Sequence, residues 1–370
     1  MSALSARDAA HEPTLVPAVL KLGTRRSALA VTQSQWVAER IEKASADAGS
    51  PVRVELVELV TVGDASSAPL TSFGGVGVFV SRLREALLAG EVDVAVHSLK
   101  DLPTSPADGL VVAAVPTRED PRDVLVARDG LTLGELPPGA RVGTGSPRRA
   151  AQLRALGLGL EVVAVRGNVD TRLRYVAEGT LDAVVLARAG LARLGRLHEA
   201  TEVLDPLVML PAPGQGALAV ECRDPARPGA GDAQGLVDER IAAAVRPLDD
   251  AVTRAAVTAE RRLLAALEAG CAAPLGALAE VVDGDDGPEL SLRAVAAAVD
   301  GSVTLRRSMT ASLSDPAADP EALGNALAAL LVEDGAADLV PPSPPLQQAG
   351  STSSMFSTTP STTGTREGDL

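Results

Sequence analysis

The sequence predicts an α/β protein with two sheet-containing units and a third, smaller α+β domain. From about residue 20 to 245, short apolar runs alternate with amphipathic helical stretches, which is typical of parallel sheets with helices on both faces. After about residue 245, a long helical stretch is followed by β-like runs. The length of 370 residues and the hydrophobic share of 46% allow two or three domains, each with a core.

The predicted elements follow this alternation. In the first unit, Ser27 can cap a helix that ends near Gly49, followed by a strand at 52–60, a helix at 80–89 and strands at 92–96 and 110–115. The second unit has strands at 124–127, 162–165 and 183–186 and helices at 147–156 and 169–177. The last part has helices at 252–269 and 320–332 and β-like stretches at 276–282 and 290–305. Two such α/β units with a cleft between them form a common kind of ligand site.

The charge of the chain is unevenly distributed. The net charge of −14 argues against general nucleic-acid binding. Residues 139–196, however, contain ten arginines and only four acidic residues. Such a cationic region on an acidic protein indicates a specific anionic ligand, and solvent-exposed helix faces are the alternative explanation.

Other classes of protein are disfavoured by composition. No apolar run approaches the ~20 residues that cross a bilayer, so we expect no membrane span. The chain has two cysteines and no recognisable export signal, which favours reduced thiols in the cytoplasm. The three histidines are scattered and neither cysteine has a ligand-spaced partner, so we expect no metal site.

Two predicted strand-to-helix turns in the second unit carry arginines. Residues 143–149 (GTGSPRR) open a helix with Ser146 as N-cap, and residues 166–172 (RGNVDTR) repeat the arrangement. Both turns should leave a parallel sheet at the same edge. There, helix N-termini and guanidinium groups favour an anion, although two well-capped helices without a ligand would give the same pattern.

Two further segments can carry chemistry. Residues 95–103 (AVHSLKDLP) end an apolar strand in Lys100 and Asp101, and Lys100 is one of only three lysines among 34 basic residues. Asp101 could act as a general acid or base or stabilise a developing cation, unless it belongs to a plain surface turn. Cys271 lies in a Gly- and Pro-containing loop, where it could be a nucleophile, an attachment point or inert, whereas Cys222 should be a core thiol.

Taken in order, these motifs resemble the hydroxymethylbilane synthase (porphobilinogen deaminase) family over about residues 20–335. The matching segments are LGTRRSALA (22–30), VGVFVSRLREALL (76–88), AVHSLKDLPT (95–104), TREDPRD (117–123), VGTGSPRR (142–149), VRGNVDTRL (165–173), LPAPGQGALAVECR (210–223) and TAERRLLAALEAGCAAPLG (258–276).

The resemblance implies a fold, an activity and a cofactor. Two periplasmic-binding-protein-like (type II) α/β domains would surround a cleft, with a small C-terminal α+β domain. A transferase of this family joins four porphobilinogen molecules head to tail into hydroxymethylbilane, with loss of ammonia at each addition. The chain grows on a dipyrromethane cofactor held by a thioether, here to Cys271, and is then hydrolysed off. The family also implies a monomer.

The resemblance also implies domain boundaries. A flexible extension would span 1–18, domain 1 would span 19–117 and 212–240, and domain 2, with the Arg-rich face of the cleft, would span 118–211. Domain 3, which would carry the cofactor cysteine, would span 241–340, followed by a tail at 341–370. This tail is rich in Pro, Ser and Thr and is expected to be disordered.

Site residues follow from the same match. Asp101 would be the catalytic carboxylate that stabilises positive charge on the pyrrole nitrogen and manages proton transfers. The acetate and propionate groups of the cofactor and of the growing polypyrrole would be bound by Arg25, Ser27, Lys100, Thr144, Ser146, Arg148, Arg149, Arg166, Arg172 and Arg193. Phe79 and Gln215 would also face the cleft.

The chain departs from the family pattern in one loop. Family members often have KxGGKG where this chain has SFGGVG at 72–77. The two loop lysines are therefore absent, at Ser72 and Val76. The alternative function is a non-catalytic, two-lobed protein that binds a small anion, which would need neither Asp101 nor a covalent group.

Overall fold

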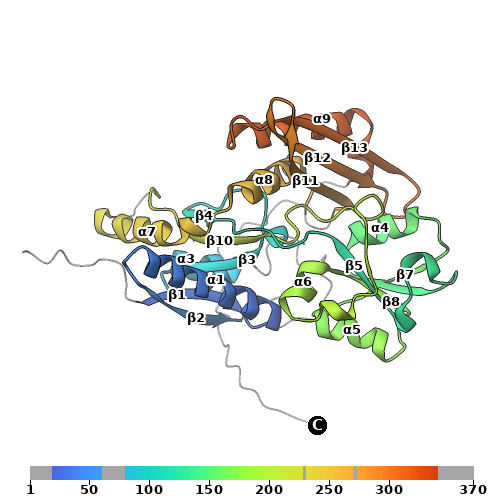
Figure 1. The fold of residues 1–370 in the computed structure, drawn as a ribbon, viewed down its shortest axis with the longest axis horizontal. Coiled ribbons are helices and arrows are strands. Elements are labelled where there is room, and N and C mark those ends of the chain that lie inside the picture. The colour runs from blue at the N-terminus through green and yellow to red at the C-terminus, as the bar shows by residue number, and fades with distance from the viewer. Residues whose placement is uncertain (1–18, 61–79, 228–230, 271–272, 341–370) are drawn as a thin grey trace, which may run out of the picture.

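The structure is a computed structural model that describes residues 19–60, 80–227, 231–270 and 273–340. These residues form three β-sheets, each with its own helices (Figure 1). Short 3-10 turns lie at Leu99–Asp101, Arg128–Gly130, Leu133–Glu135, Leu197–Glu199 and Arg246–Leu248. None of the helices in these ranges is long and apolar enough to cross a membrane.

The first sheet has the strand order β2-β1-β3-β10-β4. Its strands are β1 (Val19–Arg25), β2 (Arg53–Leu59), β3 (Val94–Ser98), β4 (Leu110–Ala114) and β10 (Leu218–Arg223). Helices α1 (Ala28–Asp47) and α7 (Asp232–Val245) pack on one face through Ile41 and Ile241. Helix α3 (Ser81–Leu88) covers the other face through Leu83 and Leu87. The sheet is thus buried on both sides, as its apolar strands require.

The second sheet repeats this design with the order β7-β6-β8-β5-β9. Its strands are β5 (Asp123–Ala127), β6 (Arg141–Thr144), β7 (Glu161–Ala164), β8 (Ala183–Ala187) and β9 (Glu202–Val203). Helix α4 (Pro147–Ala155) packs on one face through Leu153. Helices α5 (Val169–Ala177) and α6 (Arg188–Arg193) pack on the other through Leu173 and Leu191.

The third part is a three-stranded antiparallel sheet with helices on one face. It contains α8 (Ala251–Ala266), β11 (Leu275–Gly284), β12 (Gly287–Ala297), β13 (Thr304–Ser312), α9 (Ala318–Glu333) and α10 (Ala336–Leu339). Leu263 of α8, Leu292 of β12 and Leu327 of α9 are fully buried in its core. Figure 1 shows this domain, in orange and red, above the junction of the other two.

The predicted fold class is confirmed, with corrections to the sheets. We expected parallel sheets, but both large sheets are mixed, because β10 and β5 run antiparallel to their neighbours. These are the strands next to the two points where the chain passes between the sheets. The sequence did not predict strands β1 and β10 or helix α7. The predicted β-like stretch at 290–305 is split between β12 and β13 by a turn that contains Gly301, a glycine with left-handed backbone conformation.

Two segments pass between the sheets: residues 115–122 lead from β4 to β5, and residues 204–217 lead from β9 to β10. These two passing segments cross beside Gly216. Gly216 has a φ of +89°, and a Cβ there would overlap the carbonyl oxygen of Glu119 on the other segment. The backbone N–H of Glu119 donates to the oxygen of Gly216 at 3.3 Å. A glycine is therefore required by both conformation and close approach.

Helix α8 fastens this crossing to the third domain through a buried carboxylate. Glu260 has no exposed surface and binds Arg118 through two hydrogen bonds of 2.7 and 3.0 Å. It also accepts from the backbone N–H groups of Gly214 at 2.6 Å and Ala279 at 2.9 Å. Glu260 therefore joins both passing segments to strand β11.

Loss of this carboxylate should destabilise the whole protein. Glu260→Ala would leave Arg118 buried without its partner and remove the acceptor of two amides. We expect the free energy of unfolding to fall by roughly 3–5 kcal/mol, measured by urea denaturation.

The matched control is Glu239→Ala, because Glu239 forms an exposed ion pair with Arg246. Exposed pairs contribute about 0–1 kcal/mol. Equal stability of the two variants would contradict the role given to Glu260.

Candidate functional site

Two helix N-termini meet at one edge of the second sheet. Strands β6 and β7 are parallel neighbours, so the helices that follow them, α4 and α5, start at the same edge. As predicted, Ser146 caps α4, and its hydroxyl accepts from the N–H of Arg149 at 3.4 Å. Asn168 caps α5 by accepting from Thr171 at 2.9 Å. Thr144 is buried, and its hydroxyl accepts from the N–H of Ser146 at 3.2 Å.

The two arginines that open α4 are held by a buried carboxylate. Asp123, the first residue of β5, has no exposed surface and accepts from Arg148 at 2.8 Å and from Arg149 at 2.7 Å. The other terminal nitrogens donate to the carbonyl oxygens of Leu210 and Val185. The Nε atoms of both arginines are buried and have no acceptor within the described part of the chain.

Burial alone would raise the pKa of Asp123, but Arg148 and Arg149 hold it well below its usual range. Asp123 is therefore ionised at neutral pH. Its charge offsets part of the charge of the two guanidinium groups. Arg148 and Arg149 each give one terminal nitrogen to this internal carboxylate.

The polar turn after β3 reaches this cluster. The Nζ of Lys100 donates to the Oε1 of Gln215 at 3.3 Å, and the Nε2 of Gln215 donates to Asp123 at 2.7 Å. Gln215 is buried at the crossing of the two segments. Burial, and to a lesser degree Arg149 and Arg148, lower the pKa of Lys100 to about 8, although Asp101 and Asp123 oppose the shift.

Asp101 itself is exposed, at the end of the 3-10 turn that begins at Leu99. The turn follows β3, which is parallel to β1, so Arg25 at the end of β1 leaves the same edge of the first sheet. Ser27 caps α1 and accepts from Ala30 at 3.3 Å. Each sheet therefore directs its polar strand ends toward the region between the two sheets.

Two arginines in this region, Arg172 and Arg193, form no ion pair with a carboxylate of the described residues. The pKa of Arg172 is lowered to about 10 by burial and then by the positive charges of Arg149 and Arg166. The pKa of Arg193 is also lowered to about 10, mainly by burial. Within the described ranges, no ion pair joins Arg172 or Arg193 to a carboxylate; they donate to the carbonyl oxygens of Gly167 and Gly216. Partly buried cations without an ion-pair partner are suited to bind an anionic group.

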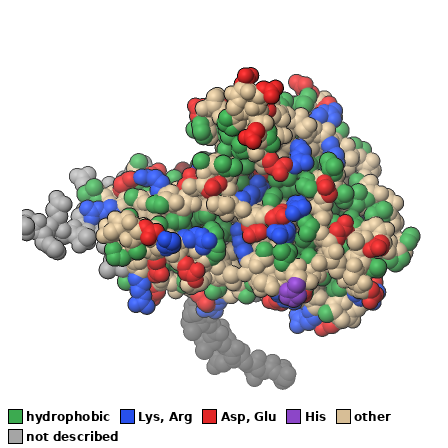
Figure 2. Space-filling model, viewed as in Figure 1, with side chains coloured by type: hydrophobic (Ala, Val, Ile, Leu, Met, Phe, Trp, Pro, Cys, Tyr) green, Lys and Arg blue, Asp and Glu red, His purple; other side chains and the backbone are tan. Residues whose placement is uncertain are grey.

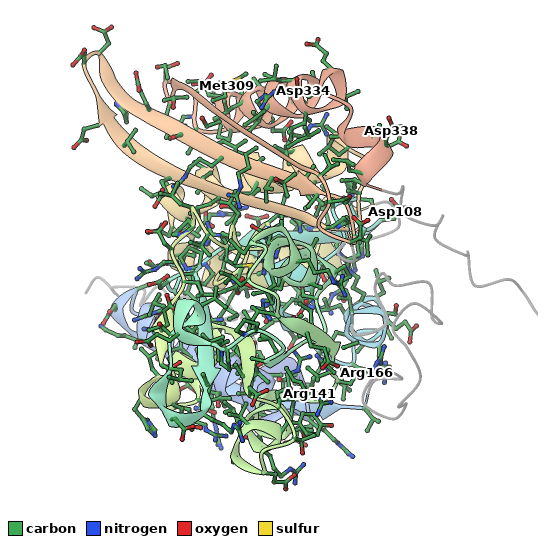
Figure 3. The ribbon with its side chains drawn as sticks, turned by 90° about the vertical axis from the view of Figure 1, so that its right-hand side faces the viewer. Asp108, Arg141, Arg166, Met309, Asp334 and Asp338 are labelled. Carbon is green, nitrogen blue, oxygen red and sulfur yellow. The ribbon has the colours of Figure 1, made fainter. Side chains whose placement is uncertain are left out.

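Figures 2 and 3 show where basic side chains lie in the molecule. Figure 2 shows Lys and Arg side chains (blue) around the centre of the face, where the three parts of the molecule meet. Figure 3 shows Arg166 in the lower half of the molecule, away from Met309 and Asp334 of the third domain.

Other arginines of residues 139–196 have structural partners. Arg188 pairs with Glu119 at 2.9 Å, and Arg196 pairs with Asp170 and Glu199. Arg154 donates to the carbonyl oxygen of Val299 in the third domain at 2.6 Å. The positive charge of the sequence is therefore divided between structural arginines and the cluster around Arg172.

Several predicted residues lie outside the described residues: Phe79, Cys271 and the loop positions Ser72 and Val76. Cys222 is buried in the first sheet, and burial raises the pKa of its thiol to about 12, as befits a core thiol. No cluster of potential metal ligands occurs in the part of the chain that the structure describes.

Sequence reasoning gave no role to Asp123, Arg118 or Glu260. One signal was available: Asp123 stands directly before the apolar run VLVA, and a carboxylate at such a position needs a cationic partner. Its partners are 25 and 26 residues away along the chain. Their proximity therefore depends on the tertiary fold.

Comparisons with known proteins cover most of the chain. Residues 20–228 match the family model described as "Porphobilinogen deaminase, dipyromethane cofactor binding domain", and residues 254–333 match "Porphobilinogen deaminase, C-terminal domain". The chain is similar to porphobilinogen deaminase of Nocardia farcinica, with 57% identity over 87% of this chain and 88% of the relative. It is also similar to porphobilinogen deaminase 1 of Streptomyces coelicolor, with 55% identity over 87% of this chain and 97% of the relative.

Among solved structures, the ligand-binding component of an ABC-type import system from Staphylococcus aureus matches with a TM-score of 0.36. The identity is 15%, over 66% of this chain and 72% of that chain.

The lowered pKa of Lys100 can be measured directly. In the Cys271→Ala variant, labelled with carbon-13 at lysine Cε, one resonance should titrate with a pKa of about 8, because burial disfavours the charged ammonium. The resonance is assigned by its loss in a Lys100→Arg variant. Carboxylates bound beside Lys100 in the unsubstituted protein should raise this pKa.

The matched control is Lys43→Arg, which removes an exposed lysine paired with Asp47. It should leave the resonance near pH 8 in place. Titration of Lys100 above pH 10 in the Cys271→Ala variant would contradict the arrangement described above.

Proposed function

The chain belongs to the porphobilinogen deaminase family, and from this premise we propose how its own residues carry out the family reaction. The protein is a hydroxymethylbilane synthase, a transferase of tetrapyrrole biosynthesis that links four porphobilinogen molecules with release of ammonia. The non-catalytic anion-binding alternative is not favoured, because the matched family models and relatives cover both the cofactor-binding and the C-terminal regions.

The family cofactor, dipyrromethane, fits the cluster around Arg172. Its acetate and propionate groups are anionic, and Arg172 and Arg193 are partly buried cations that form no ion pair with a carboxylate among the described residues. When bound, the dipyrromethane supplies the primer to which pyrrole units are added. We propose Cys271 as the residue that holds it through a thioether.

The carboxylate-binding set divides into two groups. Arg172 and Arg193 would present partly buried charge to the ligand. Donors at the strand ends and helix N-termini would be added by Arg166, Arg25, Ser27, Thr144 and Ser146. Arg148 and Arg149 would bind carboxylate groups of the ligand through N–H groups that do not donate to Asp123. Lys100, held by Gln215, adds an ammonium whose charge is available below about pH 8.

Asp101 is the proposed catalytic residue. The observation that carries this proposal is its place beside Lys100, which is within electrostatic reach of Asp101 on one side and of Arg148 and Arg149 on the other. A carboxylate at the margin of a carboxylate-binding site can stabilise the positive charge that develops on a pyrrole nitrogen when ammonia leaves. It can also exchange protons with the reacting ring.

The remaining assignments complete the proposal. Phe79 and Gln215 would face the cleft, and the protein would act as a monomer in the cytoplasm, without nucleic-acid or membrane partners. Its domains would span 19–117 with 212–240, 118–211 and 241–340, with terminal segments at 1–18 and 341–370.

The attachment of the cofactor can be tested by mass. Freshly purified protein should show an excess mass equal to two linked porphobilinogen units, and Cys271→Ala should lack it. Cys222→Ala is the matched control and should keep the excess, because that thiol is buried with a pKa raised to about 12. An excess that survives in Cys271→Ala would refute the attachment.

The role of Asp101 can be tested by steady-state and single-turnover kinetics with porphobilinogen. Asp101→Asn should fold and bind substrate but lower kcat by roughly 10²–10³-fold, the effect typical for loss of one preorganised electrostatic contact. Asp108→Asn is the control, because Asp108 is exposed further along the same loop (Figure 3). Near-normal turnover of Asp101→Asn would remove Asp101 from the mechanism.

A further inference from the structure

Helix α8 of the third domain reaches the turn that carries Asp101. The guanidinium group of Arg261 donates to the carbonyl oxygens of Leu102 at 2.8 Å and Pro103 at 2.7 Å. A longer contact of 3.3 Å reaches the carbonyl oxygen of Leu99. One half-buried side chain from a distant part of the sequence thus binds three carbonyl oxygens on the two sides of Lys100 and Asp101.

The turn has few other polar restraints. Its own hydrogen bond joins the N–H of Leu102 to the oxygen of Leu99 at 3.1 Å, and the N–H of Leu99 donates to Ala217 at 3.0 Å. Leu99 and Leu102 are buried in a small apolar cluster with Val257 of α8. Val257 and Arg261 are four residues apart and share one face of the helix, so α8 holds the turn by packing and by charge.

We propose that Arg261 is a positioning residue, which fixes the turn so that Lys100 and Asp101 project into the site. This inference rests on the proposed catalytic role of Asp101. A planar guanidinium with donors in fixed directions can hold several carbonyl groups at once. Without it, the apolar contacts of Leu99 and Leu102 keep the turn in place but do not fix the direction of the peptide groups around Asp101.

The neighbouring residue on α8 holds the opposite side of the same site. Glu260 binds the N–H of Gly214 and the guanidinium of Arg118, which in turn donates to the carbonyl oxygen of Gln215 at 2.7 Å. Gln215 is the acceptor for Lys100. Two consecutive residues of α8 therefore orient both partners of the Lys100–Gln215 contact, and Cys271 follows shortly after the end of the same helix.

The test compares Arg261→Gln, Arg261→Lys and Arg262→Gln with the unsubstituted protein. Each holoenzyme is purified, its cofactor load is measured by intact mass, and kcat and KM for porphobilinogen are measured beside the urea midpoint. Arg261→Gln should lower kcat by roughly 10–100-fold, the range expected when a catalytic group is misplaced by about 1 Å. The KM should change less than twofold at full cofactor load.

Arg261→Lys should recover part of the lost kcat, because an ammonium can bind one or two of the carbonyl groups but not all three. Arg262→Gln is the matched control: Arg262 is the next residue, is exposed and donates to Asn325 at 2.8 Å. It should keep the kcat of the unsubstituted protein. If Arg261→Gln does not fold, the reduced kcat of a folded Arg261→Lys variant decides the question.

An unchanged kcat in Arg261→Lys and Arg261→Gln would overturn the proposal, as would a loss that disappears when activity is corrected for cofactor load. A fall in kcat that is equal in Arg262→Gln would overturn it as well. Failure of the underlying function is distinguishable, because the unsubstituted protein would then form no product, or Asp101→Asn would be fully active.

Discussion

The buried ion pair between Asp123 and the two arginines that open α4 is the contact on which the site depends. A carboxylate without exposed surface carries a large desolvation cost unless its partners are in place, so Asp123 requires Arg148 and Arg149 on one side. Its third partner, Gln215, extends the network to Lys100 and, through its backbone oxygen, to Arg118. The guanidinium group of Arg118 donates to Glu260 of the third domain. One continuous polar chain thus runs through all three parts of the molecule.

This polar network explains how a site rich in arginine exists inside a stable protein. Like charges repel one another, and internal carboxylates pair with the arginines that open α4 and with Arg118 at the crossing of the two segments. Arg172 and Arg193 receive carbonyl oxygens instead. Burial lowers the pKa of both side chains to about 10, and neither forms an ion pair with a carboxylate among the described residues.

Much of the fold could be predicted from sequence, because its elements are local. Alternating apolar runs located most strands of both units, although not β1, β9 or β10. The capping roles of Ser27 and Ser146 follow from residues within one turn of helix. The direction of β5 and β10 could not be predicted in this way. An apolar run has the same sequence signature in a parallel and an antiparallel pair, and only the two passages of the chain between the sheets decide which one forms.

For the site, too, some features follow from the sequence and others only from the tertiary structure. By itself, the sequence determined which chemistry is present: the order of the motifs identified the family, and the excess of arginine in residues 139–196 indicated an anionic ligand. Only the tertiary structure decided which arginines pair with internal carboxylates, because that depends on where Asp123, Glu119 and Glu260 lie in space. It also brought Arg261 to the turn of Asp101, 159 residues from its contact at Leu102. Such pairings arise from the packing of distant elements, and no local pattern encodes them.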